Sequence, residues 1–199
     1  MTRLILIRHG QTNWNVERRK QGRNDQPLNE EGARQASLAA RHVKENYNVT
    51  KVWASPLQRC YKTALEFDMP VHTSDHLLEI DYGDWEGMLA EDIEKTSPEV
   101  AQKGADYVDP PGGELRSNLP VRGNLWLEEA NLRADTGDVV LVGHGGSMKG
   151  LLAAVLDLPD SSMFNFVIDN CSVSVIGIHP TGEEPNVLAL LNQTTHLEA

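Results

Sequence analysis

The sequence is poor in cysteine, in long hydrophobic runs and in positive charge. Its 199 residues include two cysteines, Cys60 and Cys171, without Cys-x-x-Cys spacing. Two such cysteines exclude a disulfide framework and a zinc knuckle, and they favour a reducing, cytoplasmic setting. The apolar run near the N-terminus covers only residues 4–7. Because a spanning helix needs about 20 apolar residues, we expect neither a signal segment nor a membrane partner.

The charge balance limits the classes of partner. The chain carries 29 Asp and Glu against 18 Lys and Arg, a formal net charge of -11. A surplus of negative charge disfavours nucleic acids and anionic membranes, so an anionic substrate must be attracted by local cations. The 40% hydrophobic content can build a real core. We therefore expect one domain over residues 1–199.

Apolar segments alternate between strand and helix patterns along most of the chain. This alternation predicts an α/β protein, a three-layer α/β/α sandwich with a mostly parallel central sheet and a last strand that is antiparallel at one edge. Strands are predicted over residues 3–7, 49–53, 71–73, 139–142, 172–178 and 187–191, and helices over 29–43, 57–67, 121–132 and 148–156. Residues 81–120 are rich in Gly, Pro and acidic residues. They predict a loop-rich inserted subregion.

Unusual polar residues follow three of the predicted strands. Arg8-His9-Gly10 follows the first, residues 55–59 follow the second, and Gly143-His144-Gly145-Gly146 follows the strand near residue 140. Ligands of parallel α/β sheets bind outside the carboxyl ends of the strands, so these groups are expected to share one pocket. The glycine loop matches neither a dinucleotide fingerprint nor a P-loop. Its N–H groups could still hold a phosphate at the start of the next helix.

Five sequence blocks, in their order and spacing, resemble the histidine phosphatase superfamily, which includes the cofactor-dependent phosphoglycerate mutases. The blocks are Arg8-His9-Gly10-Gln11-Thr12-x-x-Asn15, Gln21-Gly22-Arg23-x-Asp25-x-Pro27-Leu28, Ser55-Pro56-Leu57-x-Arg59-x-x-x-Thr63-Ala64, Glu79 with Tyr82-Gly83-x-Trp85-Glu86-Gly87, and Gly143-His144-Gly145-Gly146. The resemblance runs from Arg3 to about His196. It implies the phosphoglycerate mutase-like α/β fold.

The resemblance also implies the roles of individual residues. His9 matches the nucleophile that becomes a phosphohistidine, and Glu79 matches the proton donor. Arg8 and Arg59 would neutralise the phosphate oxygens, since guanidinium forks match phosphate geometry, and His144 would donate another hydrogen bond. The substrate pocket would be completed by Asn15, Gln21, Gly22, Tyr82 and Gly145. Charge neutralisation by these groups needs no metal and no cofactor.

Several departures narrow the resemblance. The segment 88–119 is short and acidic, with Lys95, Lys103 and Arg116 as its basic residues, which favours a phosphatase over a mutase. The chain is similar to small bacterial phosphatases such as metal-independent phosphoserine phosphatases and α-ribazole phosphatases. The phosphoserine phosphatases carry a histidine in the place of Tyr82, so the substrate stays open as a small phosphate ester. The tail with His196 closes over the site in some relatives.

Three alternatives to a phosphohistidine hydrolase remain open. A phosphoglycerate-type mutase would interconvert isomers faster than it releases phosphate. A non-catalytic phosphate-binding module would bind phosphate and never become phosphorylated. A zinc hydrolase could use His9 and His144, but Arg8 and Arg59 would repel the cation. The chain could also pair as a homodimer through its edge strand.

Overall fold

The computed structural model describes residues 2–198 and contains one six-stranded sheet. The strand order is β3-β2-β4-β1-β5-β6. The strands are β1 (Thr2–Arg8), β2 (Val49–Ala54), β3 (Val71–Thr73), β4 (Asp138–Gly143), β5 (Val173–Ile178) and β6 (Val187–Gln193). The four strands β1 to β4 run parallel, β5 runs against β1, and the edge strand β6 is antiparallel to β5. The mostly parallel sheet is confirmed. The strand that runs against the parallel set is β5, and the last strand, β6, is antiparallel only to β5 and so runs in the direction of β1.

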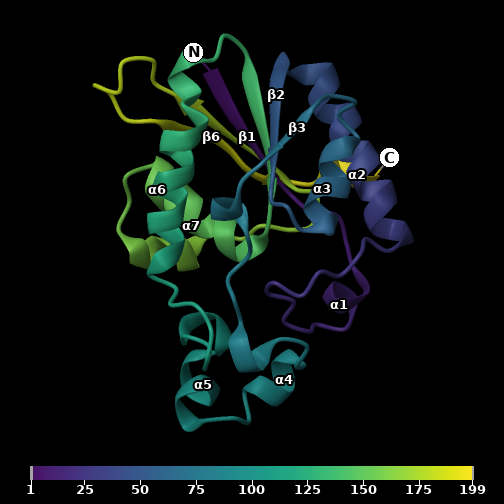
Figure 1. The fold of residues 1–199 in the computed structure, drawn as a ribbon, viewed down its shortest axis with the longest axis vertical. Coiled ribbons are helices and arrows are strands. Elements are labelled where there is room, and N and C mark those ends of the chain that lie inside the picture. The colour runs from purple at the N-terminus through teal and green to yellow at the C-terminus, as the bar shows by residue number, and fades with distance from the viewer. Residues whose placement is uncertain (1, 199) are drawn as a thin grey trace.

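Helices cover both faces of this sheet, as Figure 1 shows. They are α1 (Asn13–Val16), α2 (Glu30–Asn46), α3 (Gln58–Leu65), α4 (Ala90–Ile93), α5 (Pro98–Lys103), α6 (Asn118–Ala130) and α7 (Gly145–Val155). Short 3-10 helices are η1 (Asp75–Leu77), η2 (Gly83–Trp85), η3 (Ala105–Tyr107), η4 (Leu132–Ala134), η5 (Asp160–Asn165) and η6 (Thr195–Glu198). Helices α2 and α3 lie on one side of the sheet and α6 and α7 on the other. This is the three-layer α/β/α sandwich expected from the sequence.

The alternation of side chains along β1 explains why both faces are covered. Leu4 and Leu6 pack in one cluster with Trp126 of α6, whereas Ile5 and Ile7 pack in the other cluster. Successive strand residues point to opposite faces of the sheet. The apolar run at residues 4–7 must therefore be covered on both faces. All four β1 residues are at most 1% exposed.

Two helices begin about one turn earlier in the structure than the sequence predicts. Helix α6 begins at Asn118 rather than near residue 121, and α7 begins at Gly145 rather than at Met148. The prediction for α7 was wrong because glycines were taken as a turn. In the structure they form the first turn of the helix, directly after β4.

The segment between β3 and α6 lies beyond the carboxyl ends of the parallel strands (Figure 1). It holds only short helical turns, including α4, α5 and η3. A small apolar cluster of its own, with Ile80, Trp85 and Ile93 at 2% exposure or less, holds it together. The segment therefore forms one wall of whatever site the strand ends create.

Candidate active site

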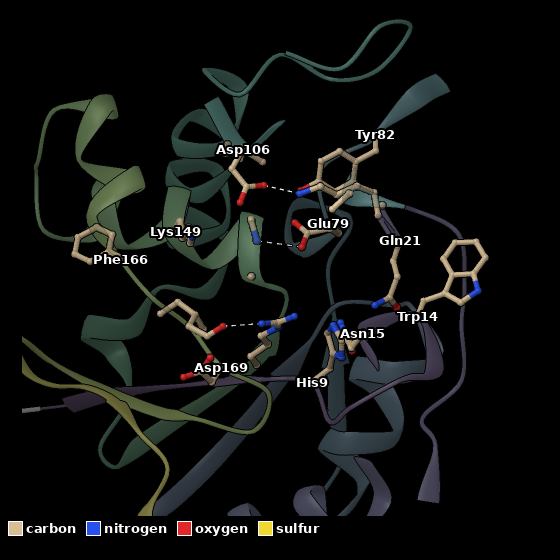
Figure 2. A pocket seen from close by; sticks show the side chains of 18 of the residues that line it. His9, Trp14, Asn15, Gln21, Glu79, Tyr82, Asp106, Lys149, Phe166 and Asp169 are labelled. Atoms are coloured by element: carbon tan, nitrogen blue, oxygen red, sulfur yellow. Dashed lines mark hydrogen bonds and ion pairs between the residues drawn. The ribbon is translucent and has the colours of Figure 1, made fainter. Parts of the chain in front are cut away.

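A cavity of about 510 Å³ opens at the carboxyl ends of β1 and β4 (Figure 2). Its walls come from the ends of these strands, the start of α7, the loop after α1 and the segments around Asp106 and Phe166. Seven arginines and lysines line it against three carboxylates. In a chain of net charge -11, this concentration of cations makes the cavity a local attractor for anions.

His9 is positioned by the backbone at the end of β1. Its N–H donates to the Gly143 carbonyl at 2.9 Å, which ties the ends of β1 and β4 together. The ring Nδ1 lies 2.7 Å from the Gly10 carbonyl oxygen. Because a carbonyl only accepts, Nδ1 carries the proton and Nε2 keeps its lone pair. His9 lines the cavity and is 3% exposed, so its unprotonated nitrogen is held in a fixed orientation.

The surroundings of His9 keep its ring neutral. Burial is the largest cause, followed by the positive charges of Arg59 and Arg8, and together they lower its pKa well below the usual 6.5. The carbonyl of Gly10 opposes them weakly. Sequence reasoning identified the arginines and missed the larger contribution of burial, since burial follows from the packing of the strand end.

The terminal nitrogens of Arg8 and Arg59 donate hydrogen bonds to backbone carbonyls. Arg8 Nη1 donates to the Ile168 carbonyl at 2.7 Å. Arg59 donates from Nη1 to the Asn24 carbonyl at 2.9 Å and from Nη2 to the Gly22 carbonyl at 2.8 Å. The Nε atoms of both arginines are buried and find no partner within residues 2–198. Both residues line the cavity together with His9, and both charges lower the pKa of His9.

His144 lies behind His9 rather than in the cavity wall. It is fully buried, and its ring meets that of His9 edge to face with centroids 5.2 Å apart. Its Nε2 is 2.8 Å from the Ser55 hydroxyl and 3.4 Å from Cys60 Sγ. Burial, then Arg59, lowers its pKa well below the usual range. His144 is therefore a neutral, hydrogen-bonded ring that supports His9.

Cys60 is a small buried residue, as the sequence predicts. It is 0% exposed and burial raises the pKa of its thiol. Cys171 is buried as well, and burial raises the pKa of its thiol to about 12. Both thiols are free, and neither is activated.

The side chain of Glu79 lies at the N-terminus of α7. Its carboxylate accepts the N–H groups of Gly146 at 3.0 Å and Ser147 at 2.9 Å, and that of Ile80 at 2.9 Å. A Cβ on Gly146 would lie 2.5 Å from Glu79 Oε1, so glycine is what lets the carboxylate approach. The sequence predicted that these N–H groups could hold a phosphate. The group they bind in the structure is the Glu79 carboxyl group.

The five predicted substrate-binding residues all line the cavity, namely Asn15, Gln21, Gly22, Tyr82 and Gly145. The Asn15 carboxamide oxygen accepts the Thr12 N–H at 3.0 Å and completes the capping box of α1. Gln21 Oε1 is buried without a partner in the part of the chain that the structure describes. Gly22 has a φ of +54°, and a Cβ there would lie 2.1 Å from Glu86 Oε1. Local backbone geometry therefore fixes the positions of Asn15 and Gly22 in the cavity wall.

Tyr82 lies in an ionic cluster that the sequence did not reveal. The Lys20 ammonium is 5.2 Å from the centre of its ring and pairs with Asp106 at 2.5 Å. The Arg116 guanidinium is 5.8 Å from the same ring. Tyr82 is 8% exposed, and burial raises its pKa, so its phenol keeps its proton. Lys20 lies more than 60 residues before the other three groups in the sequence, and no sequence motif joins them.

A buried ion pair holds the segment that carries Glu79. Arg122 of α6 donates to Glu114 from Nε at 2.7 Å, and its Nη1 donates to the carbonyls of His76 and Leu78. The Glu114 N–H in turn donates to the Asp81 carbonyl. Glu114, which follows Pro111-Gly112-Gly113 in the chain, therefore has a structural partner in Arg122.

The C-terminal tail packs on α2 and away from the cavity. The His196 ring stacks on His42 with centroids 4.8 Å apart, and its Nε2 lies 3.0 Å from the Cys171 carbonyl oxygen. His196 does not line the cavity in this structure. Within residues 2–198 no helix is long and apolar enough to span a bilayer.

A cation-lined cavity at the strand ends, with a neutral oriented imidazole between two arginines, defines a site for transfer of an anionic group. The chain matches the model of the histidine phosphatase superfamily (branch 1) over residues 4–193. It therefore belongs to the histidine phosphatase superfamily, and it is a phosphatase that hydrolyses phosphomonoesters.

Named relatives support this class of activity. Phosphoserine phosphatase 1 of Hydrogenobacter thermophilus is 36% identical over 99% of this chain and 95% of that protein. Glucosyl-3-phosphoglycerate phosphatase of Mycobacterium tuberculosis is 35% identical over 79% of this chain and 76% of that protein. The crystal structure of a phosphoserine phosphatase from Entamoeba histolytica, in complex with 3-phosphoglyceric acid, is 28% identical, with a TM-score of 0.84 over 99% of this chain and 100% of that chain.

Proposed function

We propose that the protein hydrolyses a small phosphate monoester through a phosphohistidine formed on His9. The observation that carries the proposal is a neutral His9, whose Nε2 has no hydrogen-bond partner within residues 2–198, in a cavity that Arg8 and Arg59 also line. Guanidinium donors bind phosphate oxygens, and a neutral imidazole is nucleophilic. The two relatives named as phosphatases act on phosphate esters of small molecules, which supports the same substrate class here.

The proposed reaction has two steps. In the first, His9 Nε2 attacks phosphorus, the bond from phosphorus to the ester oxygen breaks, and the Glu79 carboxyl group gives its proton to the departing oxygen. In the second, water attacks the phosphohistidine while the Glu79 carboxylate takes a proton from it. The bond between nitrogen and phosphorus then breaks and inorganic phosphate leaves. Arg8, Arg59 and the pocket residues hold the phosphoryl oxygens in both steps.

His144 has a supporting role in this proposal. Its ring packs against His9 and bonds to Ser55, so it keeps the nucleophile in place. A direct hydrogen bond from His144 to the phosphate, implied by the family resemblance, stays a prediction.

Hydrolysis is favoured over a mutase reaction. A mutase must hold a second phosphorylated acid, whereas Lys20 of the cavity wall is already paired with Asp106. The segment 88–119 contributes Arg116 to the cavity, and this guanidinium donates to the Val108 and Ala105 carbonyls. Water is then the acceptor of the phosphoryl group. Metal independence, a cytoplasmic setting and a homodimer remain predictions of the proposal.

Phosphate release from a panel of esters in the presence of EDTA tests the proposal. The panel contains phosphoserine, 3-phosphoglycerate, α-ribazole phosphate, a nucleoside monophosphate and p-nitrophenyl phosphate. We expect turnover of at least one ester with EDTA present, and a loss of at least about 10³-fold in the His9→Asn variant. His42→Asn is the matched control, because His42 lies on α2 outside the cavity. Unchanged turnover by His9→Asn would refute the phosphohistidine route, and interconversion of phosphoglycerates without phosphate release would make the protein a mutase.

A further inference from the structure

Lys149 is a cavity cation that the proposed chemistry does not use. It belongs to α7 and lines the cavity on the side of Asp106 and Phe166 (Figure 2). No hydrogen bond or ion pair joins its ammonium group to another residue of the described range 2–198. Its neighbours differ, since Lys20 pairs with Asp106 and Arg116 donates to two backbone carbonyls. Arg18 is likewise unpaired but lies exposed.

The position of Lys149 along α7 relates it to the reaction. The Glu79 carboxylate binds the N–H groups of Gly146 and Ser147 in the first turn of this helix. Lys149 is three residues beyond Gly146, so it lies on the same face about one turn further along. In the proposed reaction the phosphate binds at His9 and the departing oxygen at Glu79. The alcohol part of the ester would then occupy the part of the cavity that Lys149 lines.

The wall around Lys149 strengthens its attraction for an anion. Met163, Phe164 and Phe166 line the same cavity, and Figure 2 shows Phe166 and Lys149 on one side with Trp14 on the other. Burial lowers the pKa of Lys149, and the charges of Asp106 and Glu79 oppose that change. A charge with few water contacts and no ion-pair partner interacts more strongly with an incoming anion than a solvated one does.

Asp106 does not already fill the role of that anion. Its Oδ1 is 2.5 Å from the Lys20 ammonium, and no ion pair to Lys149 forms in the described structure. Burial alone would raise the pKa of Asp106, but the charge of Lys20 and the hydrogen bond to it lower the pKa. Asp106 is thus committed to Lys20, and Lys149 is left facing the cavity.

We propose that Lys149 binds a carboxylate on the alcohol part of the substrate, so that the protein selects phosphate monoesters of hydroxy acids. This inference rests on the proposed function, because it uses His9 and Glu79 to place the two ends of the ester. An acid group one or two carbons from the ester oxygen would sit between Glu79 and Lys149. Esters of plain alcohols would leave the Lys149 ammonium unpaired.

The test compares esters that differ only by the carboxylate. Phosphoserine is paired with phosphoethanolamine, and 3-phosphoglycerate with glycerol 3-phosphate, with p-nitrophenyl phosphate as a common reference. The wild type should prefer the acid of each pair. The Lys149→Met variant, which keeps the length of the side chain, should lose about 30-fold in kcat/KM for the acids and less than about threefold for the other esters. Lys149→Arg should recover part of the loss.

Lys62→Met on α3 is the matched control, since Lys62 is exposed and outside the cavity. An equal loss on all esters in Lys149→Met would overturn the inference, as would no loss on the acids or a wild-type preference for the esters without a carboxylate. Each of these outcomes leaves the phosphohistidine route intact, because the reference ester is still hydrolysed. Failure of the proposed function would appear differently, as no phosphate release from any ester by the wild type.

Discussion

The end of the cavity around His9 and the end around Lys149 are built from different kinds of chain. His9 follows β1 directly, and its backbone is tied to β4, the neighbouring buried strand. The opposite end is made by short turns, η3 and η5, and by side-chain pairs such as Lys20 with Asp106. The nucleophile His9 thus sits at the end of the rigid sheet, whereas Glu79 and Asp106 sit on irregular segments and Lys149 sits on α7. Rigid elements hold a reactive geometry more accurately than loops do.

The largest expected effect concerns Glu79, which lies between the two ends. Glu79→Gln keeps the shape and one of the two acceptor oxygens used by Gly146 and Ser147, but it removes the transferable proton. We expect a loss of about 10³-fold in kcat/KM for phosphoserine and other alkyl esters. For p-nitrophenyl phosphate, whose leaving group departs without a proton, the loss should be about tenfold. Steady-state phosphate release measures both.

The control for this variant is Glu66→Gln, an exposed carboxylate at the end of α3. An equal loss on alkyl and aryl esters in Glu79→Gln would mean that Glu79 acts on something other than the leaving group. The proton donor would then be a residue other than Glu79.

Much of the end of the cavity around His9 could be predicted from the sequence. The apolar pattern of residues 3–7 predicts a doubly buried strand, and the strand-end rule then brings Arg8, His9 and the Gly143 loop together. The other end could not be predicted. Lys149, Asp106 and Phe166 carry no local signal, because their roles arise from contacts between segments distant in sequence. The hydrogen bonds of Glu79 to α7 were missed for a related reason, since the glycines after His144 were taken as a turn.

The next largest effect tests the ion pair that joins the segment of Glu79 to the sheet domain. Arg122→Met removes the shorter of the two ion pairs of Glu114, whose side chain is 9% exposed, and leaves the His76 and Leu78 carbonyls unpaired. Arg23 stays 3.5 Å from Glu114, so the loss of one ion pair and two backbone hydrogen bonds should cost about 2 kcal/mol. Denaturant unfolding monitored by circular dichroism should show this decrease in the free energy of unfolding.

Arg34→Met supplies the comparison, because Arg34 pairs with Glu31 on an exposed face of α2. Its unfolding curve should match that of the wild type. Equal destabilisation by the two variants would show that the Arg122 pair contributes no more than a surface pair.

The smallest effect concerns the protonation of His9. Burial, with Arg59 and Arg8, lowers its pKa, so the neutral form persists as the pH falls through 6.5 and is lost only when the pH reaches the lower folded-state value. Long-range 1H–15N spectra of the imidazoles, with His9→Asn for assignment, should show the Nδ1–H tautomer and no titration near 6.5. A midpoint near 6.5, or an Nε2–H tautomer, would contradict the hydrogen bond to Gly10.

The lowered pKa of His9 also makes the free energy of unfolding depend on pH. Unfolded His9 binds a proton near its ordinary pKa, whereas the folded residue does not, so the free energy of unfolding should decrease as the pH falls below about 6.5. His144, whose pKa is lowered in the same way, should add to this decrease. Denaturant unfolding at pH 8 and pH 5.5 measures it, and a smaller pH dependence is expected for His9→Asn. Equal stability of the wild type at the two pH values would contradict the lowered pKa.

Trapping of the phosphorylated enzyme tests the central claim most directly. The protein is mixed with a radiolabelled ester, quenched within milliseconds in alkali and mapped by peptide mass spectrometry. The account predicts one acid-labile, alkali-stable phosphoryl group on His9, absent from His9→Asn. Turnover without any labelled protein, or a label on a residue other than His9, would contradict it.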